Sequence, residues 1–245
     1  MRNKIYQGSS KTLYQVDEDY TLIMAFNDGY RLENGEIINI SGKGVINNKI
    51  SSFLMNRLEM IGIENHLMEK INMREQLIQF ADILPFKLSI STVASGRYVT
   101  EFGIEEGYVF DNPIIDYRIK NSLLKYPVTN EHQILSFGWL TKEEITQLET
   151  KSIRIFDFLA GLFIGLNLRL VECNLEFGKV FNGEESIIML TDEVSLDNCR
   201  LWDIHTNEKL SFESADAGPE SALIFRWCGC PIICNYQDLL RQLTL

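Results

Sequence analysis

The chain has 245 residues, of which 45% are hydrophobic, and its formal net charge is −11. A chain of this length and composition can bury a sizeable core in one large domain or two small ones. The acidic balance argues against nucleic acid or an anionic membrane as the main partner, because either would require a basic surface. The sequence has neither the apolar core of a signal peptide nor an apolar stretch long enough to span a bilayer, so we expect a cytoplasmic protein.

The first part of the chain has the pattern of an antiparallel sheet. Residues 11–16 and 20–26 are short segments rich in β-branched and aromatic side chains. Turn-forming residues follow at 27–29 and 33–36, which contain Asn, Asp and Gly. Segments of this kind, bounded by such turns, are typical of strands joined by hairpins. We therefore predict a β-rich N-terminal part.

A helix is predicted next, over residues 47–61. Its apolar positions recur at helical spacing, and Gly62 stands where a left-handed cap would end the helix. Residues 76–84 then have the composition of another strand, which ends at Pro85. The pattern thus predicts one helix between strands of the N-terminal part.

The strongest helix signal lies at residues 141–167. Thr141 and Glu144 form a capping-box pattern, in which the hydroxyl accepts a hydrogen bond from a free amide and the carboxylate reaches back to the start of the helix. The length and the two apolar faces predict a buried scaffold helix. Farther on, residues 211–221 have loop composition, and residues 236–243 form the last predicted helix.

The five cysteines form no even disulfide framework, and in a reducing cytosol they would remain thiols. Three of them lie in Cys228–Cys234, whose CxCxxxC spacing lacks a clear fourth ligand for zinc. Buried or idle thiols are therefore predicted, with a zinc site as the alternative. The histidines are isolated and lack metal-ligand spacing, so His66, His132 and His205 are predicted at surface or capped positions rather than as catalytic bases.

Two carboxylates in the second half of the chain are candidate ligands. Glu176 lies in a Leu-Glu-Phe-Gly segment, and a β-hairpin would bring it face to face with Asp192. Arg200 supplies a cation nearby. Hard oxygen ligands beside a fixed arginine suit a magnesium nucleotide held next to an anionic substrate, so the pattern favours ATP chemistry. Acidic residues also flank many surface hairpins, and for this pair alone that alternative stays open.

Motifs spread over nearly the whole chain occur in the order of one family. They are Tyr6–Tyr14, Asn34–Glu36, Gly42–Ser51, Gly103–Gly107, Phe137–Trp139, Leu175–Gly178 and Asp192–Asp203. In these motifs the chain resembles the SAICAR synthetase family, ATP-dependent ligases of purine biosynthesis that join a carboxyaminoimidazole ribotide to aspartate. The resemblance implies amide formation through an acyl phosphate. In that reaction the γ-phosphate of ATP passes to a substrate carboxylate, and an amine then displaces phosphate.

The resemblance implies an α+β fold in two parts, with a smaller β-rich N-terminal domain, a larger C-terminal α+β domain and ATP in the cleft between them. Because a strand-like run meets a proline near residues 81–86, we expect the domains at residues 1–84 and 85–245. Family members use ATP and Mg²⁺ with small-molecule carboxylate and amine substrates, and they commonly form homo-oligomers. We expect the same here, with neither nucleic acid nor a membrane as partner.

The resemblance also assigns the nucleotide site. The turn formed by Gly8, Ser9, Ser10 and Lys11 is similar to the family's glycine-lysine loop over the ATP phosphates. There, backbone N–H groups and a lysine ammonium offset the charge of the triphosphate. An ordinary hairpin turn is the alternative for these residues. Backbone atoms near Ile83 are expected to hold the adenine.

The remaining roles concern catalysis and the substrates. By resemblance, the magnesium ligands are Glu176 and Asp192, which together with Lys11 are the expected catalytic residues. Arg200 is expected to grip the 5′-phosphate of the ribotide. The expected substrate-binding residues are Ser91, Arg97 and Arg200.

Several positions depart from the family pattern where ligands are expected. Ser9 replaces a second lysine, Ser91 replaces the arginine of an Arg-Asn pair, and Arg97 replaces the serine of the following turn. A stretch that carries two carboxylates in the family lacks both here and ends in Tyr126 before its proline. Asn174 replaces a lysine near the expected reaction centre, which would weaken transition-state stabilisation. Arg97 either restores the phosphate contact or recognises a different anion.

Three functions are compatible with these departures: an ordinary SAICAR synthetase with tolerated substitutions, a ligase whose carboxylate or amine substrate has changed, and a non-catalytic paralogue that binds nucleotide. The presence of Lys11, Glu176, Asp192 and Arg200 favours an enzyme. The number of altered ligand positions favours a changed substrate. We therefore predict an ATP- and Mg²⁺-dependent carboxylate–amine ligase of a specialised pathway making a nucleoside-like or amino-acid-derived compound.

Overall fold

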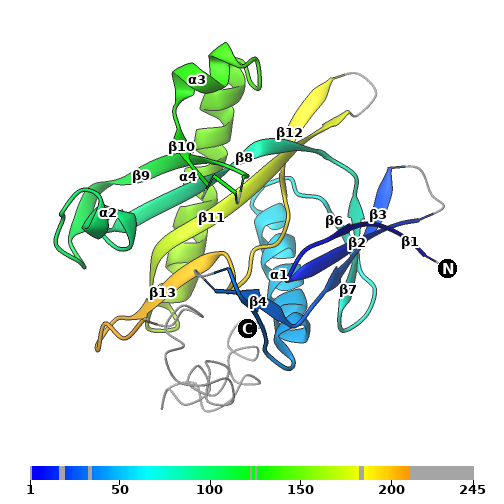
Figure 1. Cartoon of the computed structure of the whole chain (residues 1–245), viewed down its shortest axis with the longest axis horizontal. Helices are drawn as coiled ribbons and strands as arrows, with labels where there is room; N and C mark the ends of the chain where they lie inside the picture. The colour runs from blue at the N-terminus through cyan, green and yellow to red at the C-terminus, as the bar shows by residue number, and fades with distance from the viewer. Residues whose placement is uncertain are drawn as a thin grey trace.

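The N-terminal part of the chain is an antiparallel sheet of five strands in the order β1-β2-β3-β7-β6 (Figure 1). The computed structural model describes residues 2–16, 20–32, 35–121, 123–124, 126–181 and 185–209. The strands of this sheet are β1 (Asn3–Gln7), β2 (Lys11–Gln15), β3 (Thr21–Phe26), β6 (Leu67–Lys70) and β7 (Glu75–Gln79). Two further strands, β4 (Gly29–Arg31) and β5 (Ile37–Asn39), pair with each other, and α1 (Lys43–Met60) follows them. The predicted β-rich start is confirmed.

A second antiparallel sheet forms the rest of the fold. Its strand order is β10-β9-β8-β11-β12, and β13 pairs with β11. Its strands are β8 (Asp82–Val93), β9 (Val109–Ile119), β10 (Val128–Thr129), β11 (Leu168–Phe181), β12 (Ser186–Thr191) and β13 (Cys199–Asp203). The helices of this part are α2 (Arg97–Thr100), α3 (Glu131–Ser136) and α4 (Lys142–Ile164). The fold is therefore α+β, as predicted.

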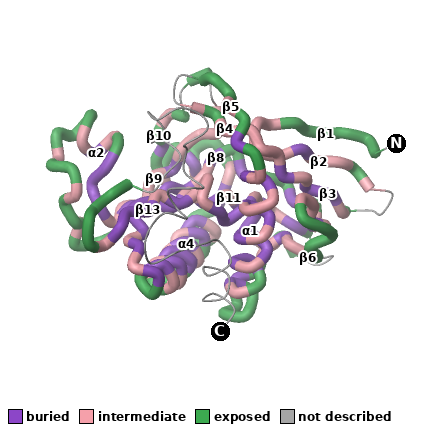
Figure 2. The backbone as a smooth tube through the Cα atoms, turned by 90° about the horizontal axis from the view of Figure 1, so that it is seen from below, coloured by how far each residue is buried: buried purple, intermediate pink, exposed green. Residues whose placement is uncertain are grey.

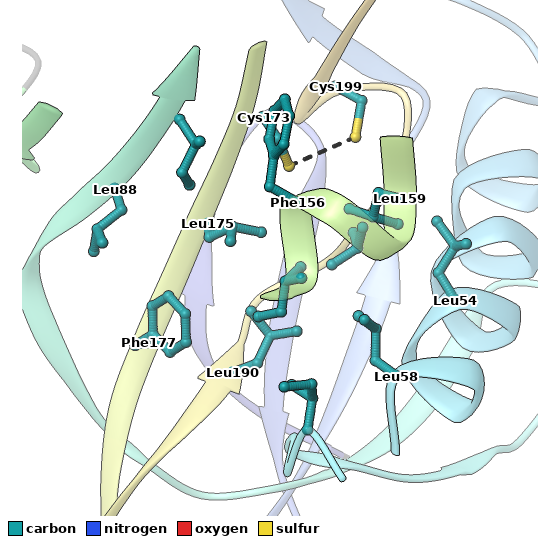
Figure 3. Packing of buried hydrophobic residues seen from close by; sticks show 14 of the residues in the cluster. Leu54, Leu58, Leu88, Phe156, Leu159, Cys173, Leu175, Phe177, Leu190 and Cys199 are labelled. Atoms are coloured by element: carbon teal, nitrogen blue, oxygen red, sulfur yellow. Dashed lines mark hydrogen bonds between the residues drawn. The ribbon is translucent and has the colours of Figure 1, made fainter. Parts of the chain in front are cut away.

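The two faces of the second sheet differ in chemistry, because side chains alternate along each strand. On β11, Cys173, Leu175 and Phe177 are buried in the main core, which also contains Phe156 and Leu159 of α4 (Figure 3). The residues between them on β11 are polar and point to the opposite face. Helix α4 covers the apolar face of this sheet (Figure 1).

Helix α4 begins as its local sequence predicts. The Thr141 hydroxyl accepts a hydrogen bond from the backbone N–H of Glu144, and the Glu144 carboxylate accepts one from the N–H of Thr141. This reciprocal capping box satisfies two of the free amides at the helix start. The helix ends at Ile164, a little before the predicted end. Within the described part of the chain, no helix has both the length and the apolar character needed to cross a membrane.

Helix α1 begins at Lys43, four residues before the predicted start. Its first amides are capped from a distance: the Asp28 carboxylate accepts hydrogen bonds from the N–H groups of Gly42 and Gly44. Arg74 holds that carboxylate with two hydrogen bonds of 2.8 and 2.9 Å, and they lower the pKa of Asp28. A cap supplied from another segment leaves no local signal, which is why the prediction began too late. At the other end, Gly62 adopts φ +79°, which confirms the left-handed cap.

The single strand predicted over residues 76–84 is wrong. Strand β7 ends at Gln79 and β8 begins at Asp82, so the chain passes from the first sheet to the second at residues 80–81. The main core nevertheless continues across this point, because Leu54 and Leu58 of α1 pack with residues of the second sheet (Figure 3). A division after residue 84 stays a prediction.

Burial follows this architecture. Figure 2 shows an exposed β1 at the edge of the first sheet and a buried inner side of α4. Cys173 and Cys199 are free thiols in the core, as predicted for the cysteines at those positions. The predicted loop at 211–221, the helix at 236–243 and the cysteine cluster Cys228–Cys234 lie outside the described residues.

Candidate active site

The polar face of the second sheet carries a row of charged side chains in register. Across it, Thr191 of β12 pairs with Glu176 of β11, Glu176 pairs with Lys87 of β8, and Lys87 pairs with Arg118 of β9. Residues that are directly paired point to the same face of a sheet. We call the face formed by Lys87, Ser89, Ser91, Asp116, Arg118, Glu172, Asn174 and Glu176 the polar face.

Lys11 of the N-terminal sheet reaches two carboxylates of the second half. Its ammonium forms an ion pair with Asp192 and another, at 3.0 Å, with Glu193. Burial alone would lower the pKa of Lys11, but the two carboxylates outweigh it and raise the pKa above its ordinary value. The same ion pair lowers the pKa of Asp192 in spite of its burial. Lys11 is therefore charged and fixed over the turn after β12.

The prediction that Glu176 lies opposite Asp192 is wrong by one residue. The hairpin of β11 and β12 exists, but Glu176 stands opposite Thr191 and not Asp192. Asp192 adopts φ +62°, in the left-handed region that aspartate tolerates better than most residues. The chain therefore turns out of the strand at Asp192, and its side chain meets Lys11.

His66 is hydrogen-bonded to the backbone of this turn. The prediction that His66 occupies a surface or capped position is wrong. Its ring is buried, and Nε2 donates a hydrogen bond of 2.8 Å to the backbone carbonyl of Asp192. Burial, together with the nearby charge of Lys11, lowers the pKa of His66 to about 4. The ring is therefore neutral at pH 7 and serves as a hydrogen-bond donor.

The neighbours of Glu176 in the sequence direct its side chain into the centre of the site. In the segment that contains it, Leu175 and Phe177 point into the core, so Glu176 points to the polar face, where Lys120 forms an ion pair with it. The next residue of the segment, Gly178, has no room for a side chain: a Cβ atom there would lie 2.9 Å from Cβ of Ala81. The segment thus joins the site to the crossing between the two sheets.

Ile83 lies beside this crossing. It pairs with Gly178 in β11, two residues from Glu176, and the residue is 43% exposed. The structure thereby brings Ile83 and the carboxylate of Glu176 to the same end of the second sheet. The predicted contact of its backbone with adenine stays a prediction.

The residues present fit a magnesium ion with phosphate oxygens. Asp192 and Glu176 offer hard carboxylate oxygens, and Oε2 of the buried Glu193 has no hydrogen-bond partner among the residues that the structure describes. No group of three or more His, Cys, Asp or Glu side chains converges in the described ranges. Magnesium is commonly held by one or two carboxylates plus substrate phosphates, so the smaller set is sufficient.

The turn from Gly8 to Ser10 joins β1 to β2 as a hairpin. The N–H of Gly8 donates to the carbonyl of Lys11, and the N–H of Asn27 donates to the carbonyl of Ser10. Gly29 lets this turn pack closely, since a Cβ atom there would lie 2.5 Å from the carbonyl oxygen of Ser9. The structure thus places Gly8, Ser9 and Ser10 next to Lys11, and their role toward phosphates stays a prediction.

Arg200 and Ser91 meet at the other end of the polar face. Arg200 donates a hydrogen bond of 2.9 Å to the hydroxyl of Ser95 and one of 3.2 Å to Glu172. Glu172 in turn pairs in register with Ser91 and accepts a hydrogen bond from the amide of Asn174. The structure thus brings two of the three predicted substrate-binding residues together around one carboxylate.

Arg97 lies close to this group but is held by other carboxylates. Its guanidinium donates to Asp116 at 2.8 Å and to Glu101 at 3.2 Å. Asp116 also accepts a hydrogen bond of 2.9 Å from the Tyr98 hydroxyl. Since Asp116 belongs to the polar face, Arg97 stands at its border.

Six ionisable residues were not predicted from the sequence as members of this site. They are Lys87, Lys120, Arg118, Glu172, Glu193 and His66. The alternation of polar and apolar residues along 87–91 and 172–176 carried a signal for the strand residues. No local pattern indicates which strands become neighbours, so the row across the sheet could not be found from sequence.

Comparisons with known proteins identify similar sequences and similar folds. The sequence model of the family described as SAICAR synthetase matches residues 4–217. The phosphoribosylaminoimidazole-succinocarboxamide synthase of Rickettsia bellii (strain OSU 85-389) is 61% identical over 222 residues, which cover 91% of this chain and 94% of that protein. The crystal structure of the synthase of that name from Ehrlichia chaffeensis has a TM-score of 0.85 at 36% identity and covers 99% of this chain and 98% of its own. A SAICAR synthetase (Type-2) solved in complex with ADP has a TM-score of 0.82 at 28% identity, covering 98% and 97%.

Proposed function

Because the chain belongs to the SAICAR synthetase family, we propose that it carries out that family's reaction on the purine substrates, the ATP-dependent joining of a carboxyaminoimidazole ribotide to aspartate. The protein is an ATP-dependent ligase of small molecules. The observation that carries the proposal is the meeting of Lys11 from the first sheet with Asp192 and Glu193 from the second half, beside the polar face.

The expectation of a changed substrate in a specialised pathway is wrong. A relative that is 61% identical over 91% of this chain bears the name phosphoribosylaminoimidazole-succinocarboxamide synthase, which favours an ordinary member of the family. That expectation gave too much weight to the departures from the family pattern, which are Ser9, Ser91, Arg97, Tyr126 and Asn174. Positive charge comes from other positions: Lys87 lies on the polar face, and Lys120 pairs directly with Glu176.

The residues of the site suit acyl-phosphate chemistry, which depends mainly on positioning and on neutralising negative charge. Lys11 and Lys120 place ammonium groups directly against Asp192 and Glu176. Such fixed cations stabilise charge on a transferring phosphoryl group without reorganisation during the reaction. Binding of the nucleotide beside Gly8, Ser9, Ser10 and Ile83 is part of the proposal.

A magnesium ion bound by Glu176 and Asp192 would neutralise phosphate charge and orient the nucleotide. The unpartnered oxygen of Glu193 supports such an ion. At the other end of the polar face, Ser91 and Arg200, with Arg97 at the border, are proposed to bind the ribotide. We also propose a homo-oligomer, as family members commonly form, which light scattering after gel filtration tests.

The test of the function is ADP release by the purified protein with ATP and magnesium. We expect turnover with carboxyaminoimidazole ribotide plus aspartate, and none when either is omitted. A panel of other carboxylates and amines is the control for specificity. Turnover with a different pair and silence with the purine pair would contradict the proposal, as would silence with all pairs despite ADP binding.

A further inference from the structure

Two cations stand side by side on the polar face. Lys87 of β8 and Arg118 of β9 are directly paired in register, so their side chains leave the sheet next to each other. Like charges in directly opposed positions destabilise an antiparallel pair. Both side chains lie only partly exposed in the site, which strengthens the repulsion relative to open water. The arrangement therefore suits an anion that lies against both groups.

Arg118 has unused hydrogen-bonding capacity. Its nearest carboxylate in the described ranges is Asp116, at 3.9 Å. Oδ2 of Asp116 already accepts hydrogen bonds from Arg97 and Tyr98, at 2.8 and 2.9 Å. Nε of Arg118 is buried and has no hydrogen-bond partner among described residues. A buried donor without a partner costs free energy unless a ligand accepts its hydrogen bond.

Lys87 is similarly uncommitted. Among the residues whose positions are described, its ammonium forms no ion pair, and it lies 5.3 Å from the centre of the Tyr126 ring. Glu176, its paired neighbour on β11, is held by Lys120. The ammonium of Lys87 is thus available to an anion, and it stands beside the carboxylate at the centre of the site.

We propose that Lys87 and Arg118 form a binding site for a carboxylate group of the substrates. The inference rests on the proposed function, which supplies two carboxylate substrates, the ribotide and the amino acid. A guanidinium and an ammonium together satisfy both oxygens of a carboxylate. The site stands next to Glu176, whereas Ser91 and Arg200 lie farther along the same face. Ser91 lies four positions after Lys87 on β8, about 13 Å away at ~3.3 Å per residue, so one face accommodates two separate anionic groups.

Steady-state kinetics of Lys87→Gln and Arg118→Gln test this site. Each variant keeps hydrogen-bonding capacity but loses its charge. A charged hydrogen bond contributes about 1.5–3 kcal/mol, so we expect the KM for one of the two carboxylate substrates to rise roughly tenfold or more. The substrate whose KM rises identifies the carboxylate. The dissociation constant for ADP is expected to change less than about twofold, and Lys87→Arg is expected to restore much of the affinity. Lys142→Gln, on the exposed start of α4, is the matched control.

The outcomes separate this inference from the proposed function. If wild-type protein turns over the purine pair and both Lys87→Gln and Arg118→Gln keep its KM values, the proposed carboxylate site is contradicted. Loss of ADP binding or of thermal stability in both Lys87→Gln and Lys87→Arg would assign Lys87 a structural role. That result would also overturn the proposed carboxylate site. If the wild type fails to turn over the pair, the proposed function falls. Calorimetric titration with succinate, a simple dicarboxylate, then tests the site alone: weaker binding by both variants supports it, and equal binding overturns it.

Discussion

The ammonium of Lys11 offsets the negative charge of two carboxylates that the fold buries beside each other. Asp192 and Glu193 are adjacent in the chain, and both pair with its ammonium. Burial raises the pKa of Glu193 although Lys11 opposes the rise, whereas the ion pair with Lys11 lowers the pKa of Asp192. Asp192 is thus the carboxylate that stays ionised most readily. This difference makes it the better candidate for a metal ligand of the two.

For Asp192→Ala we expect loss of magnesium-dependent nucleotide binding. The change removes a hard oxygen ligand and leaves Lys11 and Glu193 in place. Calorimetric titration of ADP, with magnesium and with a chelator, measures the dependence. Wild type should bind more tightly with magnesium, while the variant should bind with one weak affinity in both buffers. Asp157→Ala, on the exposed side of α4, is the control. A variant with unchanged magnesium dependence would remove the metal assignment.

His66 gives the protein a pH-dependent stability. Its pKa is lowered from 6.5 to about 4 by burial, so the unfolded chain binds a proton more readily than the folded one. The contribution of neutral His66 is therefore complete above pH 6.5 and is lost as pH falls toward 4. From the shift, wild type should lose about 2 kcal/mol of unfolding free energy from this group between pH 7 and pH 5.

The matching variant is His66→Gln, whose amide can still donate to the carbonyl of Asp192 but does not titrate. Denaturant unfolding of both metal-free proteins at pH 7 and pH 5 gives the comparison. The variant should lose less stability than wild type on acidification, by about the amount assigned to His66. Parallel losses in the two proteins would show that His66 already titrates near its ordinary pKa in the folded state.

At the scale of elements, the sequence predicted what local interactions decide. The capping box of Thr141 and Glu144 needs only four consecutive residues, and α4 begins where that pattern places it. The start of α1 depends on Asp28, which lies in another segment, and the prediction missed it. The row from Glu176 to Arg118 depends on strand neighbours and register, which a single sequence does not specify. Family resemblance supplied Lys11, Glu176 and Asp192, but no pattern singled out Lys87.

Strand β11 ties the site to the crossing between the sheets through Gly178. In Gly178→Ala the new Cβ would lie 2.9 Å from Cβ of Ala81 and 3.1 Å from the carbonyl oxygen of Asp82. Overpacking of this kind costs about 1–3 kcal/mol, and the backbone shift should displace Glu176 and reduce turnover. Unfolding free energy and kcat measure the two effects. Gly161→Ala is the matched control, because nothing lies near its Cβ and alanine favours a helix by about 1 kcal/mol. Equal effects of the two changes would contradict the packing argument.

At the scale of the whole molecule, two lysines of the N-terminal part hold the loop between β12 and β13. Lys11 of β2 pairs with Asp192 at its start, and Lys43 at the start of α1 pairs with Asp197 at 2.5 Å. His66 adds a hydrogen bond to the same loop. The acidic loop therefore belongs to the second half by sequence and is positioned by the first half. This explains why the candidate metal ligands depend on both parts of the chain.

Lys43→Met should weaken the whole fold, because the Lys43 side chain is fully buried and Asp197 would lose its cation. Breaking one partner of a buried ion pair costs about 3–5 kcal/mol, whereas an exposed pair contributes about 1 kcal/mol or less. Urea unfolding measures the loss, and Lys209→Met, which breaks the exposed pair with Glu106, is the control. The double change Lys43→Met with Asp197→Asn should recover part of the stability, since it removes the uncompensated charge. A loss in Lys43→Met no larger than in the control would mean that the loop is held by its own turn and not by the N-terminal part.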